Sequence, residues 1–225
     1  MIGVNQLYQK VEDTLVKNQS GTFSNDEFNL NLVTAQNDVF NFFMQKDGES
    51  SYVHDALQPF LETHTVAITQ PIALPADYRS KRSAKVEYFQ MVGDSPVKKS
   101  RSLDFLKTDE KNKTLESPVR GPSLEKEVLL YTIEGNGINI FPETLTGTFI
   151  MLYLRKPAVA VRQVTVDTVN EIEIYNPVGT VDLEWPEQYF NTFHEVICFY
   201  QGFQVRESEV IQWLSTKAQY DQRGK

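Results

Sequence analysis

The segment HEVIC, residues 194–198, is the part of the sequence closest to a known metal-binding motif. In zinc proteases two histidines four residues apart on a helix hold the metal, and here Cys198 stands where the second histidine would be. Cysteine also binds zinc, but no third ligand follows at a suitable spacing, and the only other histidines are His54 and His64. We therefore expect Cys198 to be a core residue, and we expect no metal and no other cofactor.

Patterns for other kinds of catalysis are equally weak. The Gly-x-Ser-x-Gly nucleophile motif is absent, and Cys198 lies in the middle of a helical pattern, away from the helix N-terminus that would activate a thiolate. The glycines of EGNGIN, residues 134–139, lack the spacing and the lysine of a phosphate-binding loop. Carboxylate pairs such as Asp182 and Glu184 are common on solvated faces of acidic proteins. We therefore expect a protein that is not an enzyme.

Charge is distributed unevenly along the chain. Residues 79–126 hold 12 Lys/Arg and 7 Asp/Glu, whereas the rest of the chain holds 10 and 23. Oppositely charged patches favour docking against a neighbour, because complementary charges orient two surfaces during encounter. The alternative is a solvated lysine-rich loop with no partner. A pI of about 5.0 argues against a nucleic-acid-binding domain.

The segment KRSAKVEYF, residues 81–89, interleaves basic and aromatic residues, a pattern also found in single-strand nucleic-acid binding. If this segment is a strand, Val86 and Tyr88 share one face, and Lys85 and Phe89 lie on the other. We expect both aromatic side chains to pack in the core.

The N-terminal region is predicted to form two helices. Apolar residues from Val4 to Leu15 recur at helical spacing. In FSNDEF, Ser24 and Glu27 form a capping box and Phe23 and Phe28 a hydrophobic staple, so a second helix is expected to begin at Asn25. Glycines at 21 and 48 are expected to end these helices, and residues 52–61 are expected to add a further turn.

Strand patterns follow in THTVAITQPIALP, AKVEYFQMVG and EVLLYTIEGNGINIFPE and continue to residue 177. Asn136 and Gly137 are predicted to form the tight turn of a hairpin. Residues 94–125 show no convincing strand period and are predicted to be an extended arm or interaction loop.

Helical spacing returns after Asp182. Pro186 suits the first position of a helix that ends at Gly202, and a closing helix is expected to bury Val210, Ile211, Leu214 and Ala218. The order predicts an α+β fold in which N- and C-terminal helices pack as a bundle around an inserted antiparallel β-rich region, either a sheet or a small barrel. The expected boundaries are 1–62 for the N-terminal helices, 63–182 for the inserted region and 183–225 for the C-terminal helices.

The first residues lack the pattern of a secretory signal, and no stretch approaches the length of a membrane-spanning helix. We therefore expect a protein that works in the cytoplasm or in an assembly made there, without a membrane partner.

Several segments taken together resemble a known class of protein. They are LPADY (74–78), SPVRGP (117–122), GNGINIFPETLTGTFIMLYLRKPAVA (135–160) and the stretch from DLEWPEQYF (182–190) to VIQW (210–213). In this order, after a helical start, they resemble the ring proteins of short-tailed bacteriophages, particularly crAss-like and related phages, that lie between portal and tail.

The resemblance implies a virion structural protein, a head-to-tail connector or adaptor assembled in the host cytoplasm. It implies about twelve copies in a ring around the DNA channel, with the portal protein and adjacent tail or ring proteins as partners and non-specific passage of genomic DNA. The candidate subunit or portal interface is a set of basic residues: Arg79, Lys81, Arg82, Lys98, Lys99 and Arg101. The alternative is a small soluble interaction or scaffold module unrelated to virions.

Overall fold

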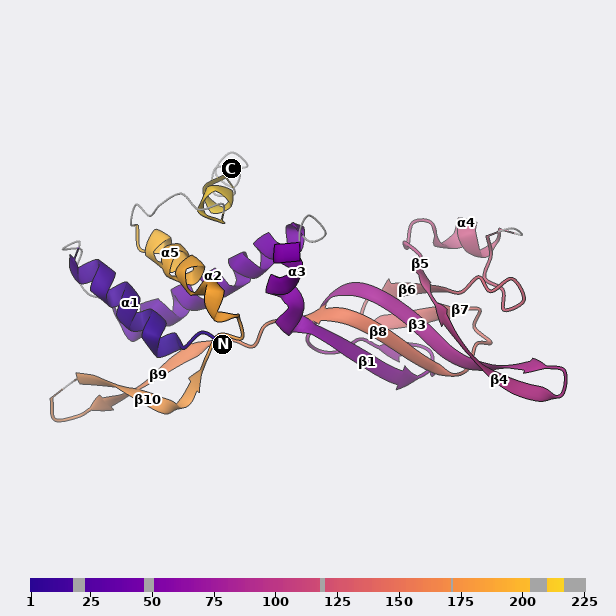
Figure 1. The fold of residues 1–225 in the computed structure, drawn as a ribbon, viewed down its shortest axis with the longest axis horizontal. Helices are drawn as coiled ribbons and strands as arrows, with labels where there is room; N and C mark the ends of the chain where they lie inside the picture. The colour runs from indigo at the N-terminus through magenta and orange to yellow at the C-terminus, as the bar shows by residue number, and fades with distance from the viewer. Residues whose placement is uncertain (18–22, 47–50, 118–119, 171, 203–209, 217–225) are drawn as a thin grey trace. The chain divides into compact units, whose positions relative to one another are not determined.

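The computed structural model describes residues 1–17, 23–46, 51–117, 120–170, 172–202 and 210–216 (Figure 1). The chain divides into two compact units: unit 1 contains residues 1–59 and 157–225, and unit 2 contains residues 60–156. The predicted mixed α+β class is confirmed. Among the described residues the strands form open sheets rather than a closed barrel.

Unit 1 is built from helices and one β-hairpin. Its helices are α1 (Val4–Lys17), α2 (Asn25–Gln45), α3 (Ser51–Leu57) and α5 (Phe190–Tyr200), which follows the short 3₁₀ helix η2 (Glu187–Tyr189). Residues 210–216 are also helical, and Val210, Ile211 and Leu214 are buried as predicted. The hairpin pairs β9 (Val161–Asp167) with β10 (Ile172–Val181) in antiparallel register.

The start of α2 confirms the predicted capping box. Ser24 Oγ accepts from the Glu27 amide at 3.2 Å, and Glu27 Oε2 accepts from the Ser24 amide at 3.0 Å. The rings of Phe23 and Phe28 lie 5.8 Å apart, as expected for the staple. The predicted stops at residues 21 and 48 and the buried position of Ala218 lie outside the described residues.

The core of unit 1 is aromatic. Trp185 is fully buried, and its ring lies 5.7 Å from Phe43, 5.7 Å from Tyr189 and 5.5 Å from Phe193. These rings come from α2, η2, α5 and the segment before η2, so one cluster joins the N- and C-terminal helices. Such tilted and edge-to-face pairs stabilise a core beyond the area that they bury.

A buried arginine fixes the β9–β10 hairpin to the helices. Arg162 donates from Nε to Asn5 Oδ1 at 3.0 Å and from Nη1 to Asn25 Oδ1 at 2.9 Å, while its guanidinium lies 3.8 Å from the ring centre of Tyr8. The Asn29 side chain binds both backbone groups of Arg162. Its Oδ1 accepts from the Arg162 amide at 2.8 Å, and its Nδ2 donates to the Arg162 carbonyl at 2.9 Å. The side of the hairpin that carries Arg162 therefore faces α1 and α2.

Unit 2 is a sandwich of two four-stranded sheets. The first has the order β1 (Leu61–Ala67), β8 (Thr148–Arg155), β3 (Tyr78–Val92) and β4 (Ser95–Ser102). The second has the order β2 (Ile72–Ala73), β7 (Gly137–Phe141), β6 (Leu130–Glu134) and β5 (Asp104–Phe105). All pairings are antiparallel except β5 with β6, which is parallel.

The main core of unit 2 lies between these sheets. Val86, Phe149 and Met151 of the first sheet pack with residues of the second such as Ile138 and Ile140, all fully buried. The other face of the second sheet has a small core of its own, where Leu106, Leu130 and Phe141 pack beside Leu115 of the short helix α4 (Lys111–Leu115). Both faces of the second sheet are therefore covered.

The secondary structure and the unit boundaries differ in part from the sequence predictions. The predicted arm at 94–125 contains β4, β5 and α4, because β4 pairs with the long strand β3 although its own residues are almost all exposed. The positive φ of the 134–137 turn falls on Gly135, at 58°, rather than on the predicted Asn136 and Gly137. The hairpin at 161–181 belongs to unit 1 rather than to the predicted β-rich region of 63–182, because it is fixed to the helices through Arg162.

Arg162→Met tests the attachment of the hairpin. Methionine keeps an apolar stem but leaves the buried Asn25 oxygen and the half-buried Asn5 oxygen without the Arg162 donors, so we expect unit 1 to lose about 2–4 kcal/mol of unfolding free energy. The measurement is urea unfolding followed by tryptophan fluorescence, since both tryptophans, Trp185 and Trp213, lie in unit 1. Lys10→Met, at an exposed position of α1, is the control; an equal loss in both variants would contradict a specific role for Arg162.

Gly147→Ala tests the approach of the chain to β3. Gly147 has a φ of 144°, and an added Cβ would collide with the Glu87 carbonyl oxygen and lie 3.1 Å from Tyr88 Cα. We expect a loss of about 3 kcal/mol or more in the stability of unit 2, measured by hydrogen exchange of the β3 and β8 amides. Gly93→Ala, where φ is 62° and the surrounding space is open, should cost only about 1–2 kcal/mol. Equal protection of the β3 and β8 amides in Gly147→Ala and Gly93→Ala would show that the close contact of Gly147 with β3 does not contribute to stability.

Candidate functional site

The outward side of the β3–β4 hairpin carries exposed apolar side chains. In the register Phe89 pairs with Lys98, Met91 pairs with Pro96, and Glu87 precedes them on the same face. Phe89 is 71% exposed and Met91 is 62% exposed, whereas Val86 and Tyr88 on the opposite face are buried. We call Lys85, Glu87, Phe89, Met91 and Lys98 the outer face of β3–β4.

Charges on this face are paired but accessible. Lys98 Nζ lies 2.7 Å from Glu87 Oε2, and Lys85 Nζ lies 3.8 Å from Glu87 Oε1. The hydrogen bond from Lys98, with its positive charge, lowers the pKa of Glu87. Because the two lysine side chains are 61% and 50% exposed, they leave a positively charged rim beside Phe89 that a second carboxylate can reach.

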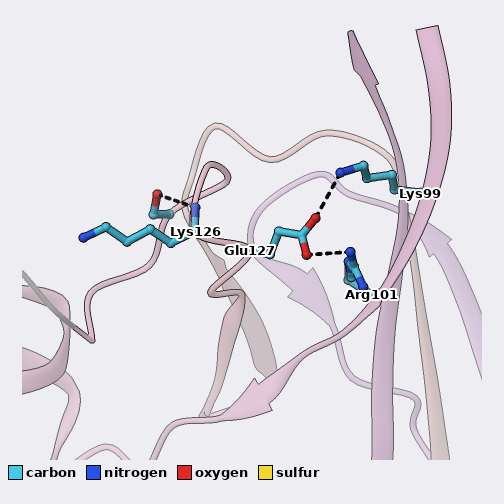
Figure 2. Close-up of polar contacts among 5 residues, drawn as sticks. Lys99, Arg101, Lys126 and Glu127 are labelled. Carbon is cyan, nitrogen blue, oxygen red and sulfur yellow. Dashed lines mark hydrogen bonds and ion pairs between the residues drawn. The ribbon is translucent and has the colours of Figure 1, made fainter. Parts of the chain in front are cut away.

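Lys99 and Arg101 of β4 share one carboxylate. Glu127 Oε1 lies 3.0 Å from Lys99 Nζ, and Glu127 Oε2 lies 2.5 Å from Arg101 Nη2 (Figure 2). Hydrogen bonds from Lys99 and Arg101 lower the pKa of Glu127. Glu127 holds this position with a φ of 55°, which a residue with a side chain rarely adopts. The pair of bridges therefore joins β4 to the loop before β6.

The remaining predicted basic residues lie at the other end of β3. The Lys81 ammonium sits 3.2 Å from the ring centre of Phe105, and burial together with the charge of Lys107 lowers its pKa. Burial also lowers the pKa of Arg82, while Arg79 is exposed. The six predicted interface residues thus form separate groups rather than one patch: Lys98 is on the outer face of β3–β4, Lys99 and Arg101 bind Glu127, and Lys81 covers an aromatic ring. Their role at an interface stays a prediction.

The outward side of the β9–β10 hairpin is a second exposed apolar surface. Ile172 pairs with Asp167, and Ile174 pairs with Thr165, so these four residues share the face opposite Arg162. Ile172 is 59% exposed and Ile174 is 53% exposed. We call Thr165, Asp167, Ile172 and Ile174 the outer face of β9–β10. Figure 1 shows this hairpin, in orange, running beside α1.

Asp167 gives this second face a fixed negative charge. Its Oδ1 accepts from the Val169 amide at 2.9 Å, and its Oδ2 accepts from Asn170 Nδ2 at 2.8 Å. These hydrogen bonds lower the pKa of Asp167 and keep the carboxylate ionised at neutral pH. Each oxygen retains a lone pair for a further donor.

The HEVIC segment lies in α5. His194 Nε2 is 3.6 Å from Cys198 Sγ and 3.0 Å from Thr14 Oγ1. Burial, and secondarily the charge of Glu195, raises the pKa of the buried Cys198 thiol to about 11, which disfavours a reactive thiolate. Within the described parts of the chain no group of three metal-ligating side chains comes together.

Sequence reasoning missed the exposed apolar residues. Tyr88 is buried as predicted, but the expected core position of Phe89 is wrong, because strand alternation places it on the outer face with Lys98. Ile172 and Ile174 alternate with Glu173 and Tyr175, a pattern that indicates one apolar face without saying whether that face is covered.

In the described regions no helix is both long and apolar enough to cross a membrane.

No protein-family model matches this chain, and no curated protein matches its sequence.

Glu127→Gln tests the bridges in Figure 2. Because folding lowers the Glu127 pKa, the carboxylate stabilises the fold above its unfolded pKa of about 4.3, and this contribution is lost as the pH falls through the lower folded value. We expect the variant to have a slightly lower unfolding midpoint than the wild type at neutral pH, and the difference to vanish in acid. The measurement is thermal unfolding by circular dichroism as a function of pH.

Glu125→Gln, an exposed neighbour, is the matched control and should leave the neutral-pH midpoint unchanged. A Glu127→Gln difference that persists unchanged below the folded pKa would mean that the amide disturbs the loop for reasons other than charge.

Proposed function

We propose that this protein is a virion structural protein that forms a ring between portal and tail, a head-to-tail connector of a short-tailed bacteriophage. The observation that carries the proposal is the pair of exposed apolar hairpin faces, one on each unit, with charges of opposite sign beside them. The resemblance of the segments between residues 74 and 213 to phage ring proteins supplies the biological setting.

Exposed apolar side chains support an assembled state. Single exposed hydrophobic residues are ordinary, but groups of them on one surface mark sites of protein interaction. Phe89 and Met91 form such a group in unit 2, and Ile172 and Ile174 form one in unit 1. A chain with such groups on both of its units is suited to contacts with more than one neighbour.

Two unlike surfaces favour a ring. A dimer with twofold symmetry uses the same surface on both subunits, whereas a ring uses two different surfaces that meet head to tail and close. Residues 78–102 hold seven Lys/Arg and two Asp/Glu, whereas residues 161–181 hold one Lys/Arg and three Asp/Glu. The two hairpins therefore differ in charge as well as in position in the chain.

The overall charge of −8 suits a channel for DNA, because a wall of carboxylates repels the phosphate backbone. In this proposal about twelve copies surround the channel, and the portal protein and adjacent tail or ring proteins are the axial partners. Basic residues outside the outer face of β3–β4, such as Arg79, are candidates for contact with the portal.

The test is assembly of the full chain. We expect light scattering to show an oligomer whose mass grows with concentration, and electron microscopy to show rings, either for the chain alone or after mixing with the portal protein of the same particle. Because the contact includes charges, higher salt should weaken it.

A chain that stays monomeric at every concentration and does not bind the portal would overturn the proposal and favour the alternative of a soluble interaction module. Turnover of a substrate by the purified chain would overturn it as well.

A further inference from the structure

We propose that the outer face of β9–β10 of one copy docks on the outer face of β3–β4 of the next copy. This inference rests on the proposed function, because it names the two surfaces through which neighbouring subunits meet. The apolar pair Ile172 and Ile174 covers Phe89 and Met91, and Asp167 faces Lys98.

The two faces match in spacing. On each face the apolar residues stand two positions apart in one strand, which separates them by roughly 7 Å. On each face a charged residue stands directly across the hairpin from the first apolar residue: Lys98 opposite Phe89, and Asp167 opposite Ile172. Two rows of equal spacing can interdigitate, and the unbranched Met91 side chain adapts to an irregular surface.

The charges select this pairing over the alternatives. Two copies of the outer face of β9–β10 would place Asp167 carboxylates together, and two copies of the outer face of β3–β4, which holds two lysines and one carboxylate, would bring together surfaces of net positive charge. An anionic membrane would likewise repel Asp167. The heterologous contact instead offers each face a charge of opposite sign beside an apolar surface.

The contact leaves the folded subunit unchanged. Ile172 and Ile174 lie opposite the side that Arg162 fixes to the helices, and Phe89 and Met91 lie opposite the core residues Val86 and Tyr88. Each hairpin thus uses one face for its own unit and has the other available for a neighbour. Substitutions on the outer faces should therefore alter association without unfolding the chain.

Cross-linking of mixed single-cysteine variants tests the proposal. Facing sheets lie about 10 Å apart, which is too far for a disulfide, so a short bismaleimide is the suitable reagent. Cys198, the single native cysteine, is buried, and the wild type measures its background reactivity. We expect a cross-linked dimer when Met91→Cys is mixed with Ile174→Cys, and little when either variant is present alone.

Val166→Cys is the matched control, because Val166 is 60% exposed on the same hairpin but lies on the face that carries Arg162. It should cross-link poorly to Met91→Cys. Equal yields for Val166→Cys and Ile174→Cys would overturn the assigned face.

Association is measured on the same chain by light scattering. Ile174→Ser and Met91→Ser should each weaken association about ten-fold or more, since each removes an apolar side chain from the contact, while Val166→Ser should not. Circular dichroism checks that all three variants fold.

The outcomes separate this inference from the proposed function. If the wild type forms rings but neither cross-linking nor the serine variants single out these faces, the inference about the contact surfaces is wrong, while the proposed ring function stands. If the wild type never associates and the cross-link is absent, both fail. Capture of Ile174→Cys or Met91→Cys, labelled with a polarity-sensitive dye, by phosphatidylserine vesicles without any cross-link between copies would assign the faces to a membrane and overturn the proposal.

Discussion

A β-hairpin has two faces, and in β3–β4 and in β9–β10 the fold packs residues of one face against the rest of their unit. In β3–β4 the covered face holds Val86 and Tyr88, and in β9–β10 it holds Arg162. Because successive side chains point to opposite sides of a strand, burying one face leaves the alternate residues outside. The exposed positions of Phe89 and Ile172 follow from this constraint, and so does the proposal that each hairpin meets a second copy.

The two hairpins are held by different forces. The covered face of β3–β4 packs on an apolar core between two sheets, and the hydrophobic effect that stabilises this packing has no preferred direction. The β9–β10 hairpin is a two-stranded ribbon, too small to be stable alone, and it depends on the guanidinium of Arg162 and the amides of Asn5, Asn25 and Asn29. Neutral amide partners can satisfy a buried guanidinium because each supplies an oxygen acceptor with defined direction.

The positions of the basic side chains in the fold, more than their number, determine which of them are available to a partner. The basic residues of the middle segment are numerous, yet the fold uses Lys99 and Arg101 to bind Glu127 and places Lys81 over Phe105. Lys98, although it bridges to Glu87, stands beside the exposed side chains of Phe89 and Met91. A surface that joins apolar area to an accessible charge gives both affinity and orientation, which a cluster of charges alone does not.

Local signals in the sequence determined the helix that begins at Asn25, the alternation of β3 and the helical stripes at both ends of the chain, because capping boxes and residue periods act over a few neighbours. The tertiary structure alone decided that β4 is a strand, that the β9–β10 hairpin joins the helices, and that Phe89 is exposed. β4 is exposed along most of its length and pairs with β3, while Arg162 binds Asn5, which lies more than 150 residues away in the sequence. A local pattern tells which residues share a face, and only the packing of distant segments determines which face is covered.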